Sequence, residues 1–213
     1  ACGWNSPIEA YYDGQVSMVW MPENTPASDG YTCVNITVDD GIELFEWQIG
    51  HCRPQVYPGQ HVGAHEVVGV EQNHGPVFSG NAQITIAQQK AGNQSGHHRH
   101  YQKRPLQPDT KTAWEPNNGY KGCIDPTKPV FQRDLWLGSR GYDVFVLQRY
   151  LKRHGFFTYP TCTGYYGPAT ATALTRFQRA TGITPTIGYF GPKTRGTIIP
   201  LMPTRLFVPP ASV

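Results

Sequence analysis

The 213-residue sequence predicts an α+β protein of two domains, a β-rich domain followed by a helical one. Gly (23) and Pro (19) are abundant while charged residues make up only 15%, a composition typical of short strands and turns. Hydrophobic residues alternate before residue 90 and recur at helical spacing after residue 131. The charge divides as well, because residues 1–128 hold 8 Lys and Arg against 13 Asp and Glu, and residues 129–213 hold 10 against 2. Together these observations argue against a coiled coil and exclude an acidic disordered tail.

Residues 1–90 are predicted to form an antiparallel β-sandwich, with the immunoglobulin-like arrangement as the working assignment. Apolar and polar residues alternate in several short segments bounded by Gly, Asn or Pro, and in one of them His61 and His65 would share a face. Asp40-Gly41 supplies the two-residue turn of a hairpin between two of these segments. The predicted strands span 15–21, 31–39, 42–49, 61–70 and 82–87.

Residues 91–129 lose this periodicity and are predicted to be an extended Pro/Gly-rich arm or linker. Such a stretch either separates two domains or lies on a neighbouring surface. It contains His97, His98 and His100, whose spacing is that of a metal cluster. Because rigid ligand geometry is hardest to maintain in the least structured part of a chain, we expect no metal site and no cofactor.

Two helices are predicted beyond residue 131. Asp143 can cap a helix that runs to about His154, with Gly155 at its stop. Pro168 suits the first turn of a second helix, which would end at Gly182.

An internal repeat lies within the same region. The sequence GYYGPAT, which starts at Gly164, recurs 24 residues later as GYFGPKT, which starts at Gly188. Each copy places an aromatic turn directly before a Pro-started helix, so the same local device is used twice.

Three segments in order, LGSRGYDVFVLQRYLKRHGFF, TGYYGPATATALTRFQRATGI and GYFGPKTRGTI, carry a family resemblance. The region from Asp134 to Leu201 resembles the three-helix peptidoglycan-binding domain (type 1), which is found in bacterial wall hydrolases and other exported bacterial proteins. The resemblance implies a helical domain over 130–201 and leaves residues 202–213 as a Pro-rich tail. The loop TYPTC around Cys162 is longer than in that family, and a bond from Cys162 to Cys123 would alter the approach to the groove.

Peptidoglycan or another anionic cell-wall polymer is the partner that this resemblance implies, and the net charge of +8 after residue 129 suits an anionic surface. Amide and guanidinium groups would bind carboxylates and acetamides, and aromatic faces would bind sugar rings. The candidate ligand-binding residues are Arg140, Gln148, Tyr165, Arg176, Gln178 and Tyr189. No nucleic-acid partner is expected, because no groove-entering motif or RNA-binding signature is present.

The five cysteines favour an oxidising compartment, because none lies in a CxxC pair or at zinc-finger spacing. We predict disulfides Cys33–Cys52 and Cys123–Cys162, since each pair lies within or at the edge of one domain, and Cys2 would then be free or bonded to another molecule. The alternative is that all five are reduced and buried as small apolar side chains. No apolar run reaches the length of a membrane span, so a secreted protein of the cell wall or outer surface is expected.

The function predicted from these observations is that of a non-catalytic, exported, wall-associated or surface structural protein. It would bind peptidoglycan through its C-terminal domain and associate with copies of itself, since a long ordered arm needs a surface to lie on. The alternative is a peptidoglycan hydrolase, bacterial or phage-borne, whose N-terminal catalytic domain is not recognised. No catalytic residue is predicted, because no cysteine sits in a recognisable nucleophile motif and no carboxylate pair can be assigned from sequence alone.

Overall fold

A computed structural model describes residues 6–20, 32–71, 77–79, 82–84, 100–106 and 128–202. By their contacts they divide into two compact units. The first unit holds residues 1–38, 45–104 and 209–213, and the second holds Asp39–Leu44 together with residues 105–208. The tip of one β-hairpin is therefore part of the helical unit.

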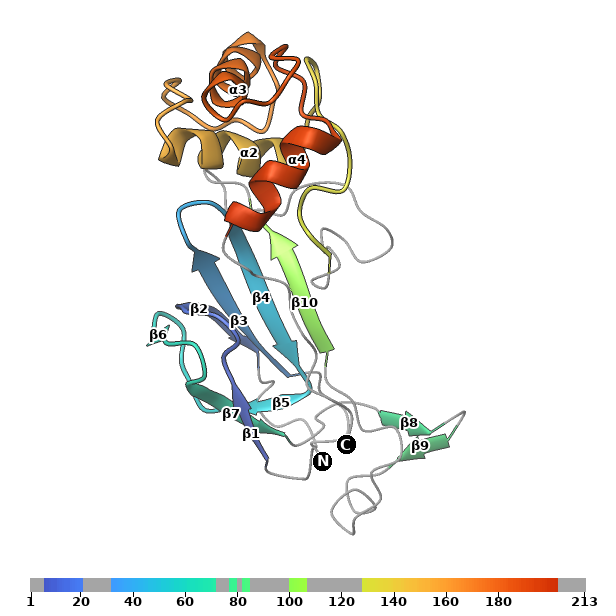
Figure 1. Cartoon of the computed structure of the whole chain (residues 1–213). Helices are drawn as coiled ribbons and strands as arrows, with labels where there is room; N and C mark the ends of the chain where they lie inside the picture. Colours follow the sequence, from blue (N-terminus) through green and yellow to red (C-terminus); the bar gives the residue numbers. More distant parts are fainter. Residues whose placement is uncertain are drawn as a thin grey trace. The chain divides into compact units, whose positions relative to one another are not determined.

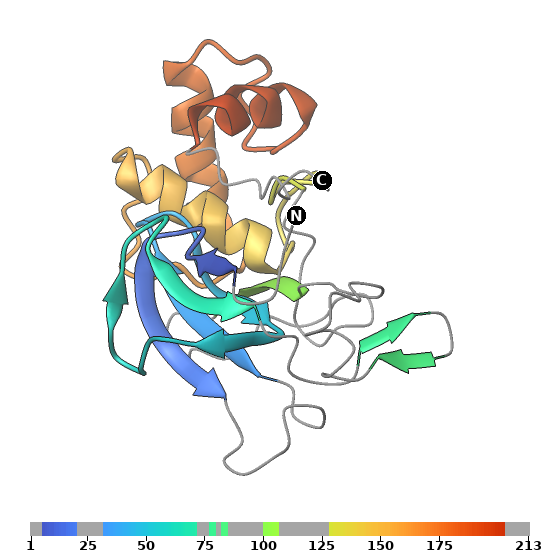
Figure 2. The ribbon, with the colours of Figure 1, turned by 90° about the horizontal axis from the view of Figure 1, so that it is seen from below.

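The described part of the first unit is built from antiparallel sheets (Figure 1). One sheet has the strand order β1 (Pro7–Glu9), β7 (Val67–Glu71) and β5 (Cys52–Pro54). A larger, visibly twisted sheet (Figure 2) has the order β10 (His100–Pro105), β4 (Leu44–Gly50), β3 (Cys33–Asp39), β2 (Gly14–Trp20) and β6 (His61–Val62). The strands β8 (Val77–Ser79) and β9 (Ala82–Ile84) form a separate pair.

The strands predicted over 15–21, 31–39 and 42–49 are confirmed as β2, β3 and β4. The prediction for 61–70 was wrong in one respect, because a turn separates β6 from β7. His65 lies in this turn at φ 68°, so His61 and His65 do not share the face of one strand. β10 lies inside the segment expected to be an arm, at the edge of the larger sheet.

The hairpin turn between β3 and β4 is longer than the predicted two residues, since four residues lie between the strands. The Asp40 carboxylate accepts hydrogen bonds from the backbone N–H groups of Ile42 (2.8 Å) and Glu43 (2.6 Å). Gly41 has a φ of 83°, which glycine adopts without steric cost. The Asp side chain thus takes the role that backbone hydrogen bonds have in a tighter turn.

β3 and β4 are buried on both faces, whereas alternation predicted one solvated face. On the apolar face Trp47 packs edge-on against Tyr12 at 5.2 Å and stacks on Tyr101 at 5.6 Å between ring centroids. On the other face polar side chains satisfy one another across strands. The contacts there are Ser17 Oγ to Glu46 (3.0 Å), Gln48 Nε2 to Asn35 Oδ1 (3.0 Å) and an ion pair of Arg104 with Glu46. Antiparallel sheets are confirmed, and the immunoglobulin-like sandwich remains a prediction.

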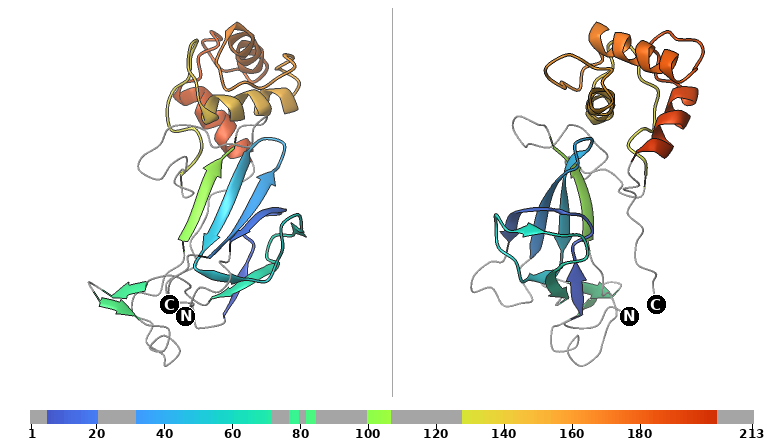
Figure 3. Two further views of the ribbon diagram at one scale, coloured as in Figure 1. Left: turned by 180° about the vertical axis from the view of Figure 1, so that it is seen from behind. Right: turned by 60° about the vertical axis from the view of Figure 1, so that its left-hand side comes forward.

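The described part of the second unit contains three α-helices, as the family resemblance implied. They are α2 (Tyr142–Arg153), α3 (Pro168–Ala180) and α4 (Pro192–Ile198), which continues as the 3₁₀ turn η1 (Ile199–Leu201). Figure 1 shows α3 end-on and α2 from the side, and the right-hand view of Figure 3 shows the reverse. The two helices therefore run across one another.

The helix starts follow the predicted signals with one correction. Pro168 and Pro192 begin α3 and α4, each after an N-cap glycine in extended conformation. The N-cap of α2 is Gly141 at φ 136°, and Asp143 lies inside the first turn instead. Its carboxylate forms an ion pair with Arg133 at 2.6 Å and complements the helix dipole from there.

The core of the second unit is aromatic and aliphatic. Phe131 and Phe190 pack with ring centroids 4.8 Å apart. Other buried members come from all three helices, from the hairpin tip and from the segments between the helices: Ile42, Leu44, Leu135, Leu147, Leu151, Tyr166, Leu174 and Ile198. Because the hairpin tip contributes apolar surface, the helical unit is completed by residues far from it in sequence.

The predicted disulfides are not found among the described cysteines, since Cys33, Cys52 and Cys162 carry thiols. Cys33 Sγ lies 3.6 Å from the Gln48 side-chain nitrogen, and the Cys52 thiol lies 3.6 Å from the Ile49 carbonyl oxygen. The first two are buried and behave as small apolar side chains with weak polar contacts. Cys2 and Cys123 lie outside the described residues.

No group of three His, Cys, Asp or Glu side chains in the described part of the chain is placed to hold a metal ion. His97 and His98 lie outside the described residues. Within the same described ranges, no helix has the length and apolar character needed to cross a membrane.

Candidate functional site

The sequence repeat of the second unit is also a structural repeat. Gly164 and Gly188 both adopt a φ of 68°, a left-handed conformation that favours glycine. A Cβ atom on Gly188 would in addition lie 2.6 Å from the Ala171 carbonyl oxygen. After each glycine comes a half-exposed tyrosine, Tyr165 (37% exposed) or Tyr189 (38% exposed). The two turns therefore present one tyrosine each at the surface.

Gln148 and Gln178 hold these turns in place. The Gln148 amide nitrogen donates to the Tyr165 carbonyl (2.8 Å) and to Thr170 (2.9 Å), and its oxygen accepts from the backbone of Gly164 (2.9 Å) and Thr163 (2.8 Å). Gln178 makes the corresponding bonds to the second turn.

Both glutamines were predicted to contact ligand, and this is corrected. Each of the two residues is only 1% exposed. Its side-chain amide forms hydrogen bonds to other groups of the same unit. Turn geometry explains why a glutamine follows Leu147 in α2 and Phe177 in α3, because a buried backbone N–H in a left-handed turn requires an acceptor.

A short segment, Asp134–Gly141, connects the two turns and is itself bent by a turn in which the Ser139 amide donates to the Trp136 carbonyl at 2.9 Å; we call it the crossing segment. At one end Leu135 and Phe190 exchange backbone hydrogen bonds of 3.0 and 2.9 Å. At the other end the Tyr166 carbonyl accepts from the Gly138 amide at 2.9 Å, and the Tyr166 amide donates to the Ser139 carbonyl at 2.8 Å. These bonds fix the backbone on which exposed side chains of the segment stand.

The crossing segment exposes two large apolar side chains, Trp136 (55%) and Leu137 (59%). Near its C-terminal end the Arg140 guanidinium lies 4.2 Å above the centroid of the Tyr165 ring. Such stacking orients a guanidinium while leaving its N–H edge able to donate. The segment therefore displays an indole, an alkyl group and an oriented cation between residues 136 and 140.

The N-terminal end of the segment carries an acid held by two donors. The Tyr189 hydroxyl donates to one Asp134 oxygen at 2.5 Å, and Arg195 Nη1 donates to the other at 2.8 Å. The hydrogen bonds from Tyr189 and Arg195 hold the pKa of Asp134 below its ordinary value, and the bond to Asp134 raises the pKa of Tyr189. At neutral pH the acid is ionised and the phenol is neutral, so the ring of Tyr189 is kept in one position.

A pocket of about 450 Å³ adjoins Tyr189. Its lining is almost wholly apolar and includes Ile183, Pro185 and Ile187, with Lys193 as its charged member. An aromatic side chain beside such a pocket suits the apolar face of a sugar ring or an aliphatic side chain of a peptide.

Of the six predicted ligand-binding residues, the structure brings Arg140 and Tyr165 together near one end of the crossing segment and places Tyr189 against Asp134 at the other end. Arg176 is exposed on α3 and makes no described contact with either turn. Sequence reasoning missed Asp134, Trp136 and Arg195. Asp134 and Arg195 are 61 residues apart, and no local pattern pairs them.

Comparison with known proteins points to the same region. Residues 140–198 match the family model described as "Putative peptidoglycan binding domain", which confirms the resemblance of the C-terminal region. No curated protein matches the chain.

Among solved structures, a similar chain comes from the study "Identification and structural characterization of LytU". It is 21% identical, and the similarity covers 60% of this chain and 66% of that chain with a TM-score of 0.38. This chain thus spans just under two thirds of that relative's length.

Proposed function

We propose that the second unit binds peptidoglycan through the crossing segment together with Tyr165 and Tyr189, which we call the binding surface. One observation carries the proposal: the crossing segment is hydrogen-bonded to both repeated turns, and the half-exposed Tyr165 and Tyr189 of these turns, like the exposed Arg140, lie within the region that matches the family model. The match alone supports wall binding in general, and the geometry of the two turns supports this choice of residues.

The chemistry of the surface suits both components of peptidoglycan. Trp136, Tyr165 and Tyr189 offer aromatic faces for sugar rings, and Arg140 offers a bidentate donor for a peptide carboxylate. Because the backbone and Arg140 are held before binding, less conformational entropy is lost when ligand arrives.

Sedimentation of the full chain with purified, insoluble peptidoglycan tests this proposal. We expect Tyr165→Ala and Arg140→Gln each to weaken binding about tenfold, since a truncated central contact costs more than 1 kcal/mol. Tyr57→Ala is the matched control, because Tyr57 is 68% exposed and lies in the first unit. Equal loss in the control, or no loss in either variant, would contradict the assignment of the surface.

The same incubation tests whether the protein is an enzyme. We propose a non-catalytic role, so bound material is expected without loss of turbidity and without soluble fragments. Release of soluble fragments would replace this role with that of a hydrolase, whose catalytic residues would then be sought in the first unit.

The proposal also includes export and association with the wall or outer surface. It further includes an immunoglobulin-like sandwich in the first unit and self-association. The net charge of +8 after residue 129 supports attachment to an anionic wall, weakened by salt. Light scattering over a range of concentrations tests self-association, which a monodisperse species near 24 kDa throughout would overturn.

A further inference from the structure

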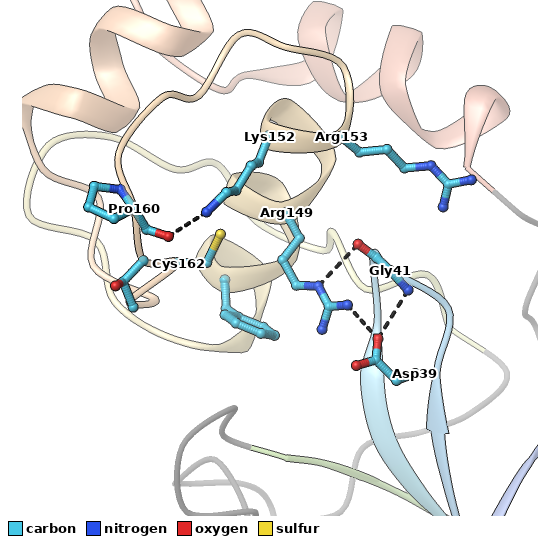
Figure 4. Close-up of a pocket in the computed structure, with 9 residues that line it drawn as sticks. Asp39, Gly41, Arg149, Lys152, Arg153, Pro160 and Cys162 are labelled. Carbon is cyan, nitrogen blue, oxygen red and sulfur yellow. Dashed lines mark hydrogen bonds and ion pairs between the residues drawn. The ribbon is translucent and has the colours of Figure 1, made fainter.

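A second concave region of the helical unit shares no residue with the binding surface. It is a pocket of about 470 Å³, lined by the C-terminal half of α2, the loop around Cys162 and the hairpin tip at Asp39 and Gly41 (Figure 4). All of these residues belong to the second unit. Nothing in the proposed function uses this pocket.

Three cations of α2 line the pocket: Arg149, Lys152 and Arg153. Their spacing of three and four residues places them on one side of the helix. The Arg149 guanidinium carbon also lies 5.4 Å from the centroid of the Phe145 ring, which restricts its position.

Each of the three cationic groups is oriented by a backbone carbonyl. Arg149 Nε donates to Gly41 (3.1 Å), and Lys152 Nζ donates to Pro160 (Figure 4). Arg153 Nη1 donates to the Asp40 carbonyl (3.0 Å). A carbonyl fixes a cation in place but does not neutralise its formal charge. The pocket wall therefore holds positioned positive charges before any ligand is present.

The charge of the pocket is not balanced by its own residues. Among the described residues that line it, Asp39 is the one acid, and its half-exposed carboxylate pairs with Arg149. This leaves a net charge of about +2 from the lining side chains. A guanidinium has five N–H donors, and the structure gives Arg153 one hydrogen bond. Unused donors and unbalanced charge together are the features of an anion site.

We propose that this pocket binds a phosphate group. Phosphate carries up to two negative charges and several acceptor oxygens, so it can accept from a guanidinium and an ammonium group together. A carboxylate has one charge and would leave part of the pocket unbalanced. The Cys162 thiol does not compete, because burial raises its pKa and keeps it neutral at pH 7.

Titration of the full chain with inorganic phosphate at constant ionic strength, followed by backbone NMR, tests the site. We expect saturable shifts in the amides of α2 and of residues 159–163. Arg153→Gln and Lys152→Gln should each weaken the affinity about tenfold, as expected for a lost hydrogen bond to a charged group. Arg179→Gln is the matched control, because Arg179 is an exposed cation in the last turn of α3 that does not line the pocket.

Linear drift without saturation would overturn the proposal, as would an equal loss of affinity in the Arg179→Gln control. An equal response to acetate would overturn the assignment to phosphate. Poly(glycerol phosphate) and vesicles of phosphatidylglycerol then distinguish the source, because Arg153→Gln should weaken attachment to the one that supplies the phosphate. Binding to peptidoglycan stripped of phosphate polymers tests the proposed function by itself. Failure of phosphate binding and failure of peptidoglycan binding are therefore distinguishable.

Discussion

The two buried glutamines give the sharpest test of how the helical unit is held together. Gln148 makes four hydrogen bonds and Gln178 makes three, and both residues are 1% exposed. Replacement by leucine keeps a similar volume but leaves buried backbone groups of each turn without a partner. At about 1 kcal/mol net per bond, Gln148→Leu should cost about 4 kcal/mol and Gln178→Leu about 3 kcal/mol.

Urea unfolding followed by far-UV circular dichroism measures this cost, since the described helices all lie in the second unit. Gln132→Leu is the control, because Gln132 is exposed and should change the free energy of unfolding by less than about 0.5 kcal/mol. If Gln148→Leu costs no more than this control, then the hydrogen bonds of the turn do not stabilise the fold and the reasoning fails.

Three further predictions concern the turns, the acid of the crossing segment and the thiols. Gly188→Ala should cost at least about 1 kcal/mol more stability than Gly182→Ala in the same assay. Both glycines have positive φ, but only at Gly188 would the new Cβ lie 2.6 Å from a carbonyl oxygen, and equal costs would contradict this. The lowered pKa of Asp134 means that its contribution to stability is present above the ordinary value of 3.8 and lost as pH falls through the lower folded value. Asp134→Asn should therefore show a shallower loss of stability on acidification than the unsubstituted protein, and identical pH profiles would refute the ion pair. Thiol titration of the unreduced, denatured protein should find at least three thiols per chain, matching the described cysteines, and a count of one or none would restore the predicted disulfides.

Local signals in the sequence were sufficient for the helices and for the central hairpin. Pro168 and the repeated Gly-Pro pair predict where α3 and α4 begin, because proline fits the first helical turn and glycine the turn before it. Alternating apolar and polar residues predict β2, β3 and β4, because side-chain direction reverses at every residue of a strand. These features depend on neighbours within a few positions of one another.

The candidate site was predictable only in part. Tyr165, Tyr189 and Arg140 follow from the motif and the expected chemistry, but Gln148 and Gln178 have the same polar character and are buried. Which polar side chain faces solvent and which one satisfies a turn depends on backbone groups 10 to 17 residues away. A sequence pattern does not contain those distances.

The sequence by itself determined the central strands β2, β3 and β4, the starts of α3 and α4, the repeated turn and the family of the C-terminal region. Only the tertiary structure decided that Asp134 meets Arg195 across 61 residues, and that the hairpin tip Asp39–Leu44 completes the core and the cationic pocket of the helical unit. It also decided that Cys33 and Cys52 remain thiols. Periodicity reports the face on which a side chain lies, whereas a site requires side chains from distant segments to come within hydrogen-bonding distance, and that is fixed by packing.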